Sequence, residues 1–308
     1  MKTVVIIHNL NSRGKHINET YIKELLSNKG IKFHYFQTME ISEIDEIIQK
    51  YNNPSDYQYC SIGGDGSLNA LVNSLMKNNI TMPEVSCLPG GSGSDFIRTF
   101  ALPQNIEEAI EHLSNQNFYE VDVGLIKNDK NIKYFINVLN IGFLASTVEV
   151  SEKFPNLFRA FRYPLSFWIK IITARAKEMS ISNDKYEFTG KAFNISVCNA
   201  QYFGGGWNIS PKSSLQDGLF NIQVFAVTKI KAMQIFFLAK KGLHLTQSSV
   251  KLKRLSKLSI NSIDPIEIDS EAHNVELNKH YPLELYEKAE KKVPSSSVTN
   301  LLDMVSNR

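Results

Sequence analysis

The sequence predicts an α/β N-terminal domain with a parallel sheet, followed by a mostly antiparallel β-sandwich domain. Over the first hundred residues, hydrophobic runs alternate with segments of helical spacing, which is typical of a parallel sheet. After about Val121, short runs of β-branched and aromatic residues are separated by turns, which is typical of antiparallel sheets. With 308 residues, 43% of them hydrophobic, the chain is long enough for a core in each domain.

The first domain, residues 1–122, is expected to contain four strands joined by helices. Its first hydrophobic run reads as a strand that is covered on both faces. Strands are expected at Thr3–His8, Ile31–Phe36, Tyr57–Ile62 and Val85–Leu88, and helices at Ile17–Asn28, Ile41–Tyr51 and Leu68–Met76. In a parallel sheet of this kind, ligands bind beyond the carboxyl ends of the strands.

The second domain, residues 123–293, is expected to be a sandwich or barrel with two helices. Strands are expected at Tyr119–Ile126, Lys133–Asn140, Ala192–Asn199, Leu219–Val227, Lys257–Ile260, Ile266–Ile268 and Tyr281–Tyr286. The helices are expected at Pro155–Lys177, with a break at Pro164, and at Lys229–Leu243. The segment 294–308 has helical spacing and is expected to pack back on the first domain.

Charge and cysteine content exclude several classes of protein. The chain has 34 basic and 31 acidic residues, a net charge of +3, whereas a dedicated nucleic-acid binder carries a larger, clustered basic excess. Cys60, Cys87 and Cys198 are scattered, which argues against a disulfide framework or a zinc site. No hydrophobic run reaches the length of about 18 residues that a membrane span needs. We therefore expect a cytoplasmic protein that does not bind nucleic acid.

Two glycine clusters stand at the expected carboxyl ends of neighbouring strands. The first is Gly63-Gly64-Asp65-Gly66-Ser67-Leu68-Asn69, and the second runs from Pro89 through Gly91, Ser92 and Asp95 to Phe96. Consecutive glycines allow backbone N–H groups to surround an anion, and a following helix adds its dipole. Ser67 can cap that helix or bind a phosphate oxygen. A tight strand-to-helix turn is the alternative, but two such loops at one sheet edge favour a nucleotide cleft.

The ordered motifs resemble those of the diacylglycerol-kinase-like lipid kinase family, with the closest similarity to soluble bacterial diacylglycerol and phosphatidylglycerol kinases. The first cluster resembles the G-G-D-G nucleotide motif of that family, and the second its P-x-G-[TS]-x-N-D-F-x-R motif. Further similarities follow in the family's order: Val121–Gly124, Phe135–Asn137, Pro211–Phe220 and Ile268–Glu271. The resemblance implies an NAD-kinase-like or phosphofructokinase-like first domain, and a kinase with ATP and Mg²⁺ as cofactors.

The resemblance also implies roles for individual residues. It implies nucleotide contacts at Asn9, Thr38, Gly63, Gly64, Asp65, Gly66, Ser67, Leu68, Asn69, Gly91 and Ser92. It implies a network in which carboxylates act through the water shell of Mg²⁺, with contributions from Asp65, Asp95 and Asp122. Asp269 and Glu271 are expected to act at the acceptor hydroxyl as catalytic residues, and i, i+2 spacing in one strand would place them on the same face. The alternative is a pair of solvent-facing strand residues.

A second metal position is implied at an Asp-Gly turn, with ligands from Ser214, Asp217 and Leu219. An ordinary turn that starts a strand explains the same residues equally well. The chain also departs from the family pattern at Ala70, at Ser94 in place of asparagine, and at Ser270 in place of glycine. If residue 270 needs a positive φ, serine is strained there.

The expected partner is a lipid substrate at a membrane surface, reached by transient peripheral association. Aromatic and basic residues are mixed over Phe154–Lys177, as in segments that lie among lipid headgroups. A helix that packs its aromatic residues on the β domain is the alternative. Two rival functions also stay open: a kinase of another small molecule such as NAD, and a lipid- or nucleotide-binding protein with weak catalysis. A homodimer is left open as well.

Overall fold

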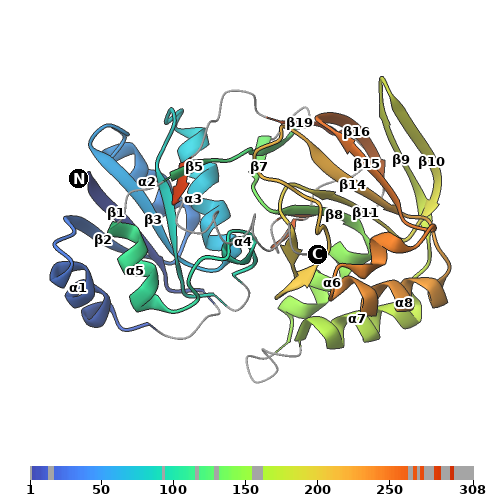
Figure 1. Ribbon diagram of the computed structural model, residues 1–308, viewed down its shortest axis with the longest axis horizontal. Coiled ribbons are helices and arrows are strands. Elements are labelled where there is room, and N and C mark those ends of the chain that lie inside the picture. Colours follow the sequence, from blue (N-terminus) through green and yellow to red (C-terminus); the bar gives the residue numbers. More distant parts are fainter. Residues whose placement is uncertain are drawn as a thin grey trace, which may run out of the picture. The chain divides into compact units, whose positions relative to one another are not determined.

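The structure, a computed structural model, describes residues 2–12, 17–91, 94–114, 118–127, 132–154 and 162–262, and the strands 266–268, 271–273, 281–285 and 292–294. The chain divides into two compact units (Figure 1), each with its own sheets. The first unit is Met1–Val121 with Glu287–Arg308, and the second is Asp122–Tyr286.

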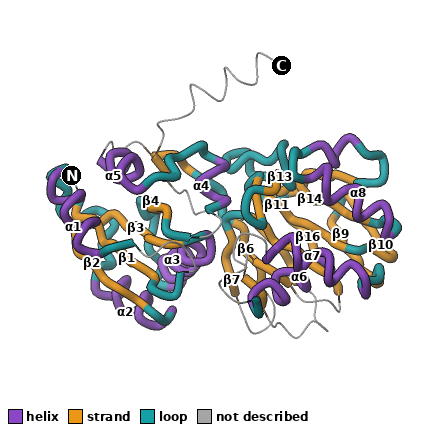
Figure 2. The backbone as a smooth tube through the Cα atoms, turned by 90° about the horizontal axis from the view of Figure 1, so that it is seen from below, coloured by secondary structure: helices purple, strands orange, loops and turns teal. Residues whose placement is uncertain are grey.

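The first unit contains the predicted parallel sheet. Its order is β2-β1-β3-β4, and all three pairings are parallel. The strands are β1 (Thr3–Asn9), β2 (Phe33–Thr38), β3 (Tyr57–Gly63) and β4 (Val85–Pro89). The helices are α1 (Glu19–Asn28), α2 (Ile41–Lys50), α3 (Asp65–Lys77), α4 (Asp95–Thr99) and α5 (Ile106–Ser114). Figure 2 shows helices on both sides of this sheet, so the inner strands β1 and β3 are buried along most of their length, as their hydrophobic runs predict.

Helix α3 begins three residues earlier than predicted, at Asp65 rather than Leu68. Gly64 is the N-cap residue, with an extended backbone. Ser67 therefore lies inside the first turn, and the expectation that it caps the helix is wrong. The early start matters because the first backbone N–H groups of α3 now directly follow the glycine pair of the first cluster.

The second half of the first unit contains an unexpected strand pair. The predicted strand Tyr119–Ile126 is in fact two strands, β5 (Phe118–Glu120) and β6 (Gly124–Lys127), and only β5 belongs to this unit. Strand β20 (Lys292–Pro294) pairs antiparallel with β5. The chain thus returns to its first unit near its end, while residues 295–308 lie outside the described residues.

The second unit is the predicted antiparallel sandwich. One sheet has the order β10-β9-β16-β19-β6-β7 and the other β15-β14-β11-β8-β17-β18, with a short pair β12-β13 beside them. The remaining strands are β7 (Ile132–Phe135), β8 (Val138–Gly142), β9 (Lys177–Asn183), β10 (Tyr186–Ala192), β11 (Asn194–Cys198), β12 (Tyr202–Phe203), β13 (Trp207–Asn208), β14 (Phe220–Phe225), β15 (Lys251–Leu255), β16 (Lys257–Ser262), β17 (Ile266–Ile268), β18 (Glu271–His273) and β19 (Tyr281–Leu285).

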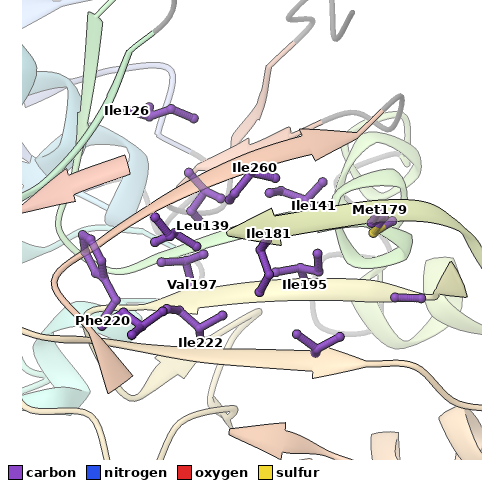
Figure 3. Close-up of a cluster of buried hydrophobic side chains, with 14 of the residues drawn as sticks. Ile126, Leu139, Ile141, Met179, Ile181, Ile195, Val197, Phe220, Ile222 and Ile260 are labelled. Atoms are coloured by element: carbon purple, nitrogen blue, oxygen red, sulfur yellow. The ribbon is translucent and has the colours of Figure 1, made fainter. Parts of the chain in front are cut away.

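The sandwich core follows from alternation along its strands. In β14, Phe220, Ile222 and Val224 point into the core, while Asn221 and Gln223 point to the other face. Figure 3 shows the side chains of both sheets meeting in this core. Its members are aliphatic except for Phe135, Phe220 and Met179.

Three helices cover the outer face of the sheet that contains β8, β11 and β14: α6 (Phe143–Glu152), α7 (Arg162–Thr173) and α8 (Lys229–Ala239). The predicted helix Pro155–Lys177 is wrong at its end, because Lys177 begins strand β9, and residues 155–161 lie outside the described residues. Pro164 does not break α7. It lies in the first turn, where the missing N–H has no helical partner to lose.

A buried polar row runs along the outer face of that sheet. Asn194 donates to Asn140 at 3.2 Å and to Ser196 at 2.9 Å, and its side-chain oxygen accepts from the backbone N–H of Leu144 at 2.9 Å. That last bond satisfies a free N–H in the first turn of α6. The row therefore anchors α6 without leaving polar atoms unpaired among the aromatic side chains around it.

His244 belongs to the same polar layer and predicts an acid sensitivity of the fold. The ring is fully buried, with Nε2 3.0 Å from Oε1 of Gln223. Burial lowers its pKa from 6.5 to about 4. Between these values the unfolded chain binds the proton and the folded chain does not, so stability is complete above pH 6.5 and declines as the pH falls toward 4.

We expect the free energy of unfolding to fall by about 2 kcal/mol between pH 7 and pH 5 because of His244 alone. Urea titrations at the two pH values measure it. In His244→Phe this part of the pH dependence should disappear, whatever the variant's stability at pH 7. His34→Gln, a change at an exposed histidine, serves as the control. An unchanged pH dependence in His244→Phe would contradict the prediction.

Candidate functional site

The carboxyl ends of the four parallel strands bring the predicted nucleotide residues of the first unit to one edge. Asn9 ends β1 and lies in register with Thr38 at the end of β2. Gly63 ends β3 and lies in register with Pro89 at the end of β4. Residues that are far apart in sequence thus share the edge where parallel α/β sheets bind ligands.

The two glycine clusters touch each other through their backbones. The N–H of Gly90 donates to the carbonyl of Gly63 at 3.0 Å. A Cβ atom at Gly91 would lie 2.1 Å from Cα of Gly64 and 2.6 Å from its nitrogen. No side chain fits between these loops, which explains why glycine stands at this point in the second cluster.

The loop after β1 joins the same assembly. The Asn9 side-chain amide donates to Oγ of Ser67 at 2.9 Å, and Oγ of Ser12 donates to the carbonyl of Gly90 at 3.0 Å. Asn9 is thus a side-chain hydrogen-bond partner of Ser67, which the sequence alone did not identify. The sequence did not single out Ser12 by itself, because a serine in a polar loop carries no signal until its partner, distant in sequence, is known.

Asp65 ties the first cluster to helix α4. Its two carboxylate oxygens accept the backbone N–H groups of Asp95, at 2.9 Å, and Phe96, at 2.8 Å. These are N–H groups at the start of α4 that have no helical partner. Burial raises the pKa of Asp65, although both hydrogen bonds and the nearby Arg98 favour its charged form.

The start of α4 has an unusual backbone. Ser94 has φ 51° and ψ 45°, the left-handed conformation, which asparagine adopts more readily than serine. The family resemblance places asparagine at this position, so the conformation gives a physical reason for that preference. Asp95 follows, buried, with its carboxylate 3.2 Å from the guanidinium of Arg98.

The other residues that the sequence predicts to contact the nucleotide lie in several different places. Gly66, Leu68 and Asn69 lie in the first turns of α3. Leu68 and Asn69 are buried, and the Asn73 side chain donates to Asn69. Thr38 is buried, and its carbonyl accepts from the N–H of Leu10. Ser92 lies outside the described residues.

This edge has the chemistry of a phosphate site. The N-terminus of the 13-residue helix α3 follows a glycine pair and has no side-chain cap on its first N–H groups. Such N–H groups and the helix dipole attract anions. Mg²⁺ in nucleotide sites is held by one or two carboxylates together with the substrate phosphates. Asp65 and Asp95 fit that requirement as a neighbouring, buried pair of carboxylates.

In the second unit, Asp122 holds the loop that contains the predicted Asp-Gly turn. Its carboxylate accepts the N–H of Gly218 at 2.8 Å, and its own N–H donates to the carbonyl of Leu215. The Asn199 amide donates to the Asp122 carbonyl at 2.9 Å. Burial raises the pKa of Asp122, the Gly218 N–H opposes this, and the charge of Asp217 adds to it.

The predicted metal position at Asp217 holds an ion pair. One carboxylate oxygen contacts the guanidinium of Arg254, and the other accepts the N–H of Leu219 at 3.0 Å. The hydroxyl oxygen of Ser214 accepts a hydrogen bond from the backbone N–H of Gln216. Within the part of the chain that the structure describes, no group of three or more His, Cys, Asp or Glu side chains could hold a metal. In this structure the Asp217 carboxylate is engaged by Arg254 and the Leu219 N–H, and the metal position there stays a prediction.

Asp269 lies outside the described residues, and Glu271 is described only as the first residue of β18. The expectation that one strand carries both is wrong. Strand β17 ends at Ile268, and β18 runs antiparallel to it, with Ile268 in register with Glu271. Since the two strands are separate, the i, i+2 argument for a shared face no longer applies.

A small apolar cavity of about 50 Å³ lies between α6, α7, α8 and the outer face of the sandwich. Aromatic side chains form much of its wall, among them Phe143, Phe167, Phe193, Trp207 and Phe236. The polar residue of its wall is Asn194, whose amide is satisfied within the polar row. Such a wall suits hydrocarbon rather than a polar ligand.

Family models match both units of the chain. The diacylglycerol kinase catalytic domain matches residues 3–126, and the YegS C-terminal NAD kinase beta sandwich-like domain matches residues 137–278. The two models match in chain order, the first mainly on the first unit and the second within the second unit. The chain belongs to the diacylglycerol-kinase-like family of YegS type. A third match, to the catalytic domain of DNA polymerase II large subunit DP2, is confined to residues 256–308 and overlaps the second.

Individual relatives agree with the family. The chain is 28% identical over 74% of its length to a Staphylococcus carnosus protein named "Putative lipid kinase", of which it covers 74%. It is 24% identical over 70% of its length to "Probable lipid kinase YegS" of Escherichia fergusonii, of which it covers 73%. A Bacillus anthracis structure described as a "putative diacylglycerol kinase" has the same fold, with a TM-score of 0.77, 23% identity and 95% of each chain covered.

Proposed function

We propose that this protein is an ATP- and Mg²⁺-dependent lipid kinase that transfers the γ-phosphate to the hydroxyl of a diacylglycerol or phosphatidylglycerol. The family assignment and the names of the relatives support a lipid kinase. The observation that carries the choice of a lipid acceptor is the apolar cavity of the second unit. NAD, a charged dinucleotide, would find no polar partner on that wall, whereas acyl chains would lose only contact with water.

The nucleotide end of the reaction is assigned to the edge of the first sheet. The N–H groups at the start of α3 and of the Gly63-Gly64 pair would bind the phosphates, with Ser67 held in place by Asn9. Asp65 and Asp95 would hold the Mg²⁺ that accompanies ATP, which neutralises phosphate charge during transfer. Asp65 also keeps the second glycine loop and α4 in position through its two hydrogen bonds.

The acceptor end is assigned to the second unit. Phosphoryl transfer needs the acceptor hydroxyl positioned in line with the γ-phosphate and a carboxylate to take its proton. Asp269 or Glu271 would take that proton. The described helices include none that is long and apolar enough to cross a membrane. The proposed site of action is the cytoplasmic membrane surface, and nucleic acid is not among the proposed partners. Metal binding at Asp217, with ligands from Ser214 and Leu219, stays a prediction.

A panel of acceptors tests the proposal. Radiolabelled γ-phosphate transfer from ATP with Mg²⁺ would be measured on diacylglycerol, phosphatidylglycerol, ceramide and sphingosine in mixed micelles, with NAD as a water-soluble rival. Label in diacylglycerol or phosphatidylglycerol is the expected result. Label in NAD alone would overturn the lipid assignment. ATP binding without label in any acceptor would favour the binding-protein alternative and make Ser270→Gly the next variant to test.

Asp269→Ala and Glu271→Ala test the assignment of the base. We expect at least one of them to lower kcat by about 100-fold or more, because general base catalysis contributes about that much. The melting temperature should stay close to that of the wild type. Asp184→Ala, at an exposed turn, is the control. If both variants keep wild-type turnover, the base must lie elsewhere.

A further inference from the structure

The loop that follows β2 exposes two large hydrophobic side chains at the candidate nucleotide edge of the first unit. Met39 is 62% exposed and Ile41 is 60% exposed. Both come shortly after Thr38, the buried residue that ends β2 in register with Asn9 at the end of β1. A single exposed hydrophobic residue needs no explanation, but this pair stands at the edge where parallel α/β sheets bind their ligands.

Several hydrogen bonds hold this loop in one conformation. The N–H of Leu10 donates to the carbonyl of Thr38 at 2.9 Å. The carboxylate of Glu43 accepts the N–H groups of Met39, at 2.6 Å, and Glu40, at 2.9 Å, and these bonds lower the pKa of Glu43. The Met39 side chain is therefore presented by a fixed backbone, and a ligand that binds on it need not order the loop first.

Asn11 belongs to the same assembly and has a fixed orientation. Its backbone N–H donates to the side chain of Asn9 at 2.9 Å, and its side-chain NH₂ group donates to the carbonyl of Met39 at 2.8 Å. A carbonyl oxygen only accepts hydrogen bonds, so the NH₂ group must face Met39 and the amide oxygen must face away. Among the described residues no donor meets that oxygen. Asn11 thus offers a hydrogen-bond acceptor to a ligand at this edge.

The separation of Met39 from the proposed phosphate site suits a nucleotide. The phosphate site lies at the end of β3, and the sheet order β2-β1-β3 places the end of β2 two strands away, at about 10 Å. A ribose with two phosphates spans such a distance. The opposite direction along the edge is closed, because the two glycine loops touch and leave no room for a Cβ atom at Gly91. The base of a nucleotide whose phosphates bind at the start of α3 is therefore directed toward β2.

We propose that the base of the nucleotide lies on the Met39 side chain and that Asn11 selects adenine through its amide oxygen. A thioether is polarizable and makes favourable contacts with aromatic rings. Adenine presents an NH₂ donor at C6, whereas guanine presents a carbonyl oxygen there. That oxygen would face the amide oxygen of Asn11, and two acceptors cannot form a hydrogen bond with each other. This selection rests on the proposed function, because it concerns the nucleotide of that reaction.

Calorimetric titration with ATP, inosine triphosphate and GTP tests the selection. Each nucleotide is added with Mg²⁺ to the full chain without any lipid acceptor, so the readout does not depend on turnover. Inosine triphosphate replaces the C6 amine of ATP by a carbonyl, and GTP adds an NH₂ group at C2. We expect ATP to bind about tenfold more tightly than inosine triphosphate, because one hydrogen bond is replaced by two facing acceptors. GTP and inosine triphosphate should bind equally.

Two variants separate the roles of the two residues. Asn11→Ala should lower the affinity for ATP to that for inosine triphosphate, so that the preference disappears. Met39→Ser should weaken the binding of all three nucleotides by about fivefold and keep the preference. The matched controls are Asn28→Ala, at the exposed end of α1, and Ile132→Ser, at an isoleucine of 59% exposure in β7. Both controls should bind nucleotides as the wild type does, and melting temperatures verify that each variant is folded.

Failure of the selection and failure of the proposed function give different results. Equal binding of ATP and inosine triphosphate to the wild type would overturn the selection and leave the nucleotide site in place. A preference for ATP that persists in Asn11→Ala would overturn the role of Asn11. Unchanged affinities in Met39→Ser would exclude Met39 as the surface on which the base lies. If none of the three nucleotides binds, both the selection and the proposed function are wrong.

Discussion

Replacing Asp65 by asparagine is expected to lower the free energy of unfolding by about 3 kcal/mol and to raise the KM for ATP at least tenfold. The wild-type carboxylate accepts two backbone N–H groups of α4. An amide offers one acceptor and turns its NH₂ group toward the second N–H, which is left unpaired in a buried place. Each lost bond to a charged group costs about 1.5–3 kcal/mol, and the second glycine loop loses its anchor.

Thermal unfolding and the dependence of turnover on ATP concentration measure the two effects of Asp65→Asn. Asp184→Asn makes the same chemical change at an exposed turn and should leave both quantities unaltered. A variant with wild-type stability and raised KM would show that Asp65 acts on the nucleotide alone. Wild-type values of both quantities would refute the role assigned to Asp65.

Gly91→Ala is expected to lower stability by about 4 kcal/mol or more and to abolish measurable ATP binding. The added methyl group would lie 2.1 Å from Cα of Gly64, and backbone cannot rotate away as a flexible side chain can. The two loops must separate, which moves the N–H groups that precede α3. Losses of this size are exceptional for a single methyl group and indicate overpacking.

Gly30→Ala is the control for Gly91→Ala. Gly30 has φ +66° and open space around its Cβ position, so alanine there suffers only the conformational cost of about 1–2 kcal/mol. ATP affinity should be retained, because Gly30 follows α1 at the opposite edge of the sheet from the glycine loops. If Gly91→Ala behaves like Gly30→Ala, the loops are not in contact as described.

Hydrophobic periodicity predicted most strands of both units, because burial on one or both faces imposes a pattern that local sequence displays. The prediction failed at residues 119–126, because there the boundary between two strands is set by their pairing partners and not by a break in the hydrophobic pattern. The run Tyr119–Ile126 is continuous in sequence, yet β5 pairs with a strand from the end of the chain, and β6 pairs with β7 and β19. Because these pairing partners are distant in sequence, the residues of the run itself carry no signal of the pairing.

Part of the candidate site was also predictable. The glycine clusters identified the sheet edge because only glycine permits the backbone contact between Gly64 and Gly91. The role of Asp65 as an anchor for α4 was not predictable, since an aspartate between glycines is equally compatible with a metal site. Arg254 gave no signal at all. Its pairing with Asp217 depends on the register of β14 with β15, which follows from the fold alone.

The pairing of β20 with β5 has a consequence for biosynthesis. The first unit contains residues from both ends of the chain, so the ribosome must synthesise the entire sandwich before Lys292–Pro294 can join Phe118–Glu120. The parallel sheet can form early, but the separate two-stranded sheet of β5 and β20 can form only after nearly the whole polypeptide has been synthesised. Folding in the order of synthesis is therefore incomplete for this unit, and premature termination near the C-terminus would release a chain whose older half is unfinished.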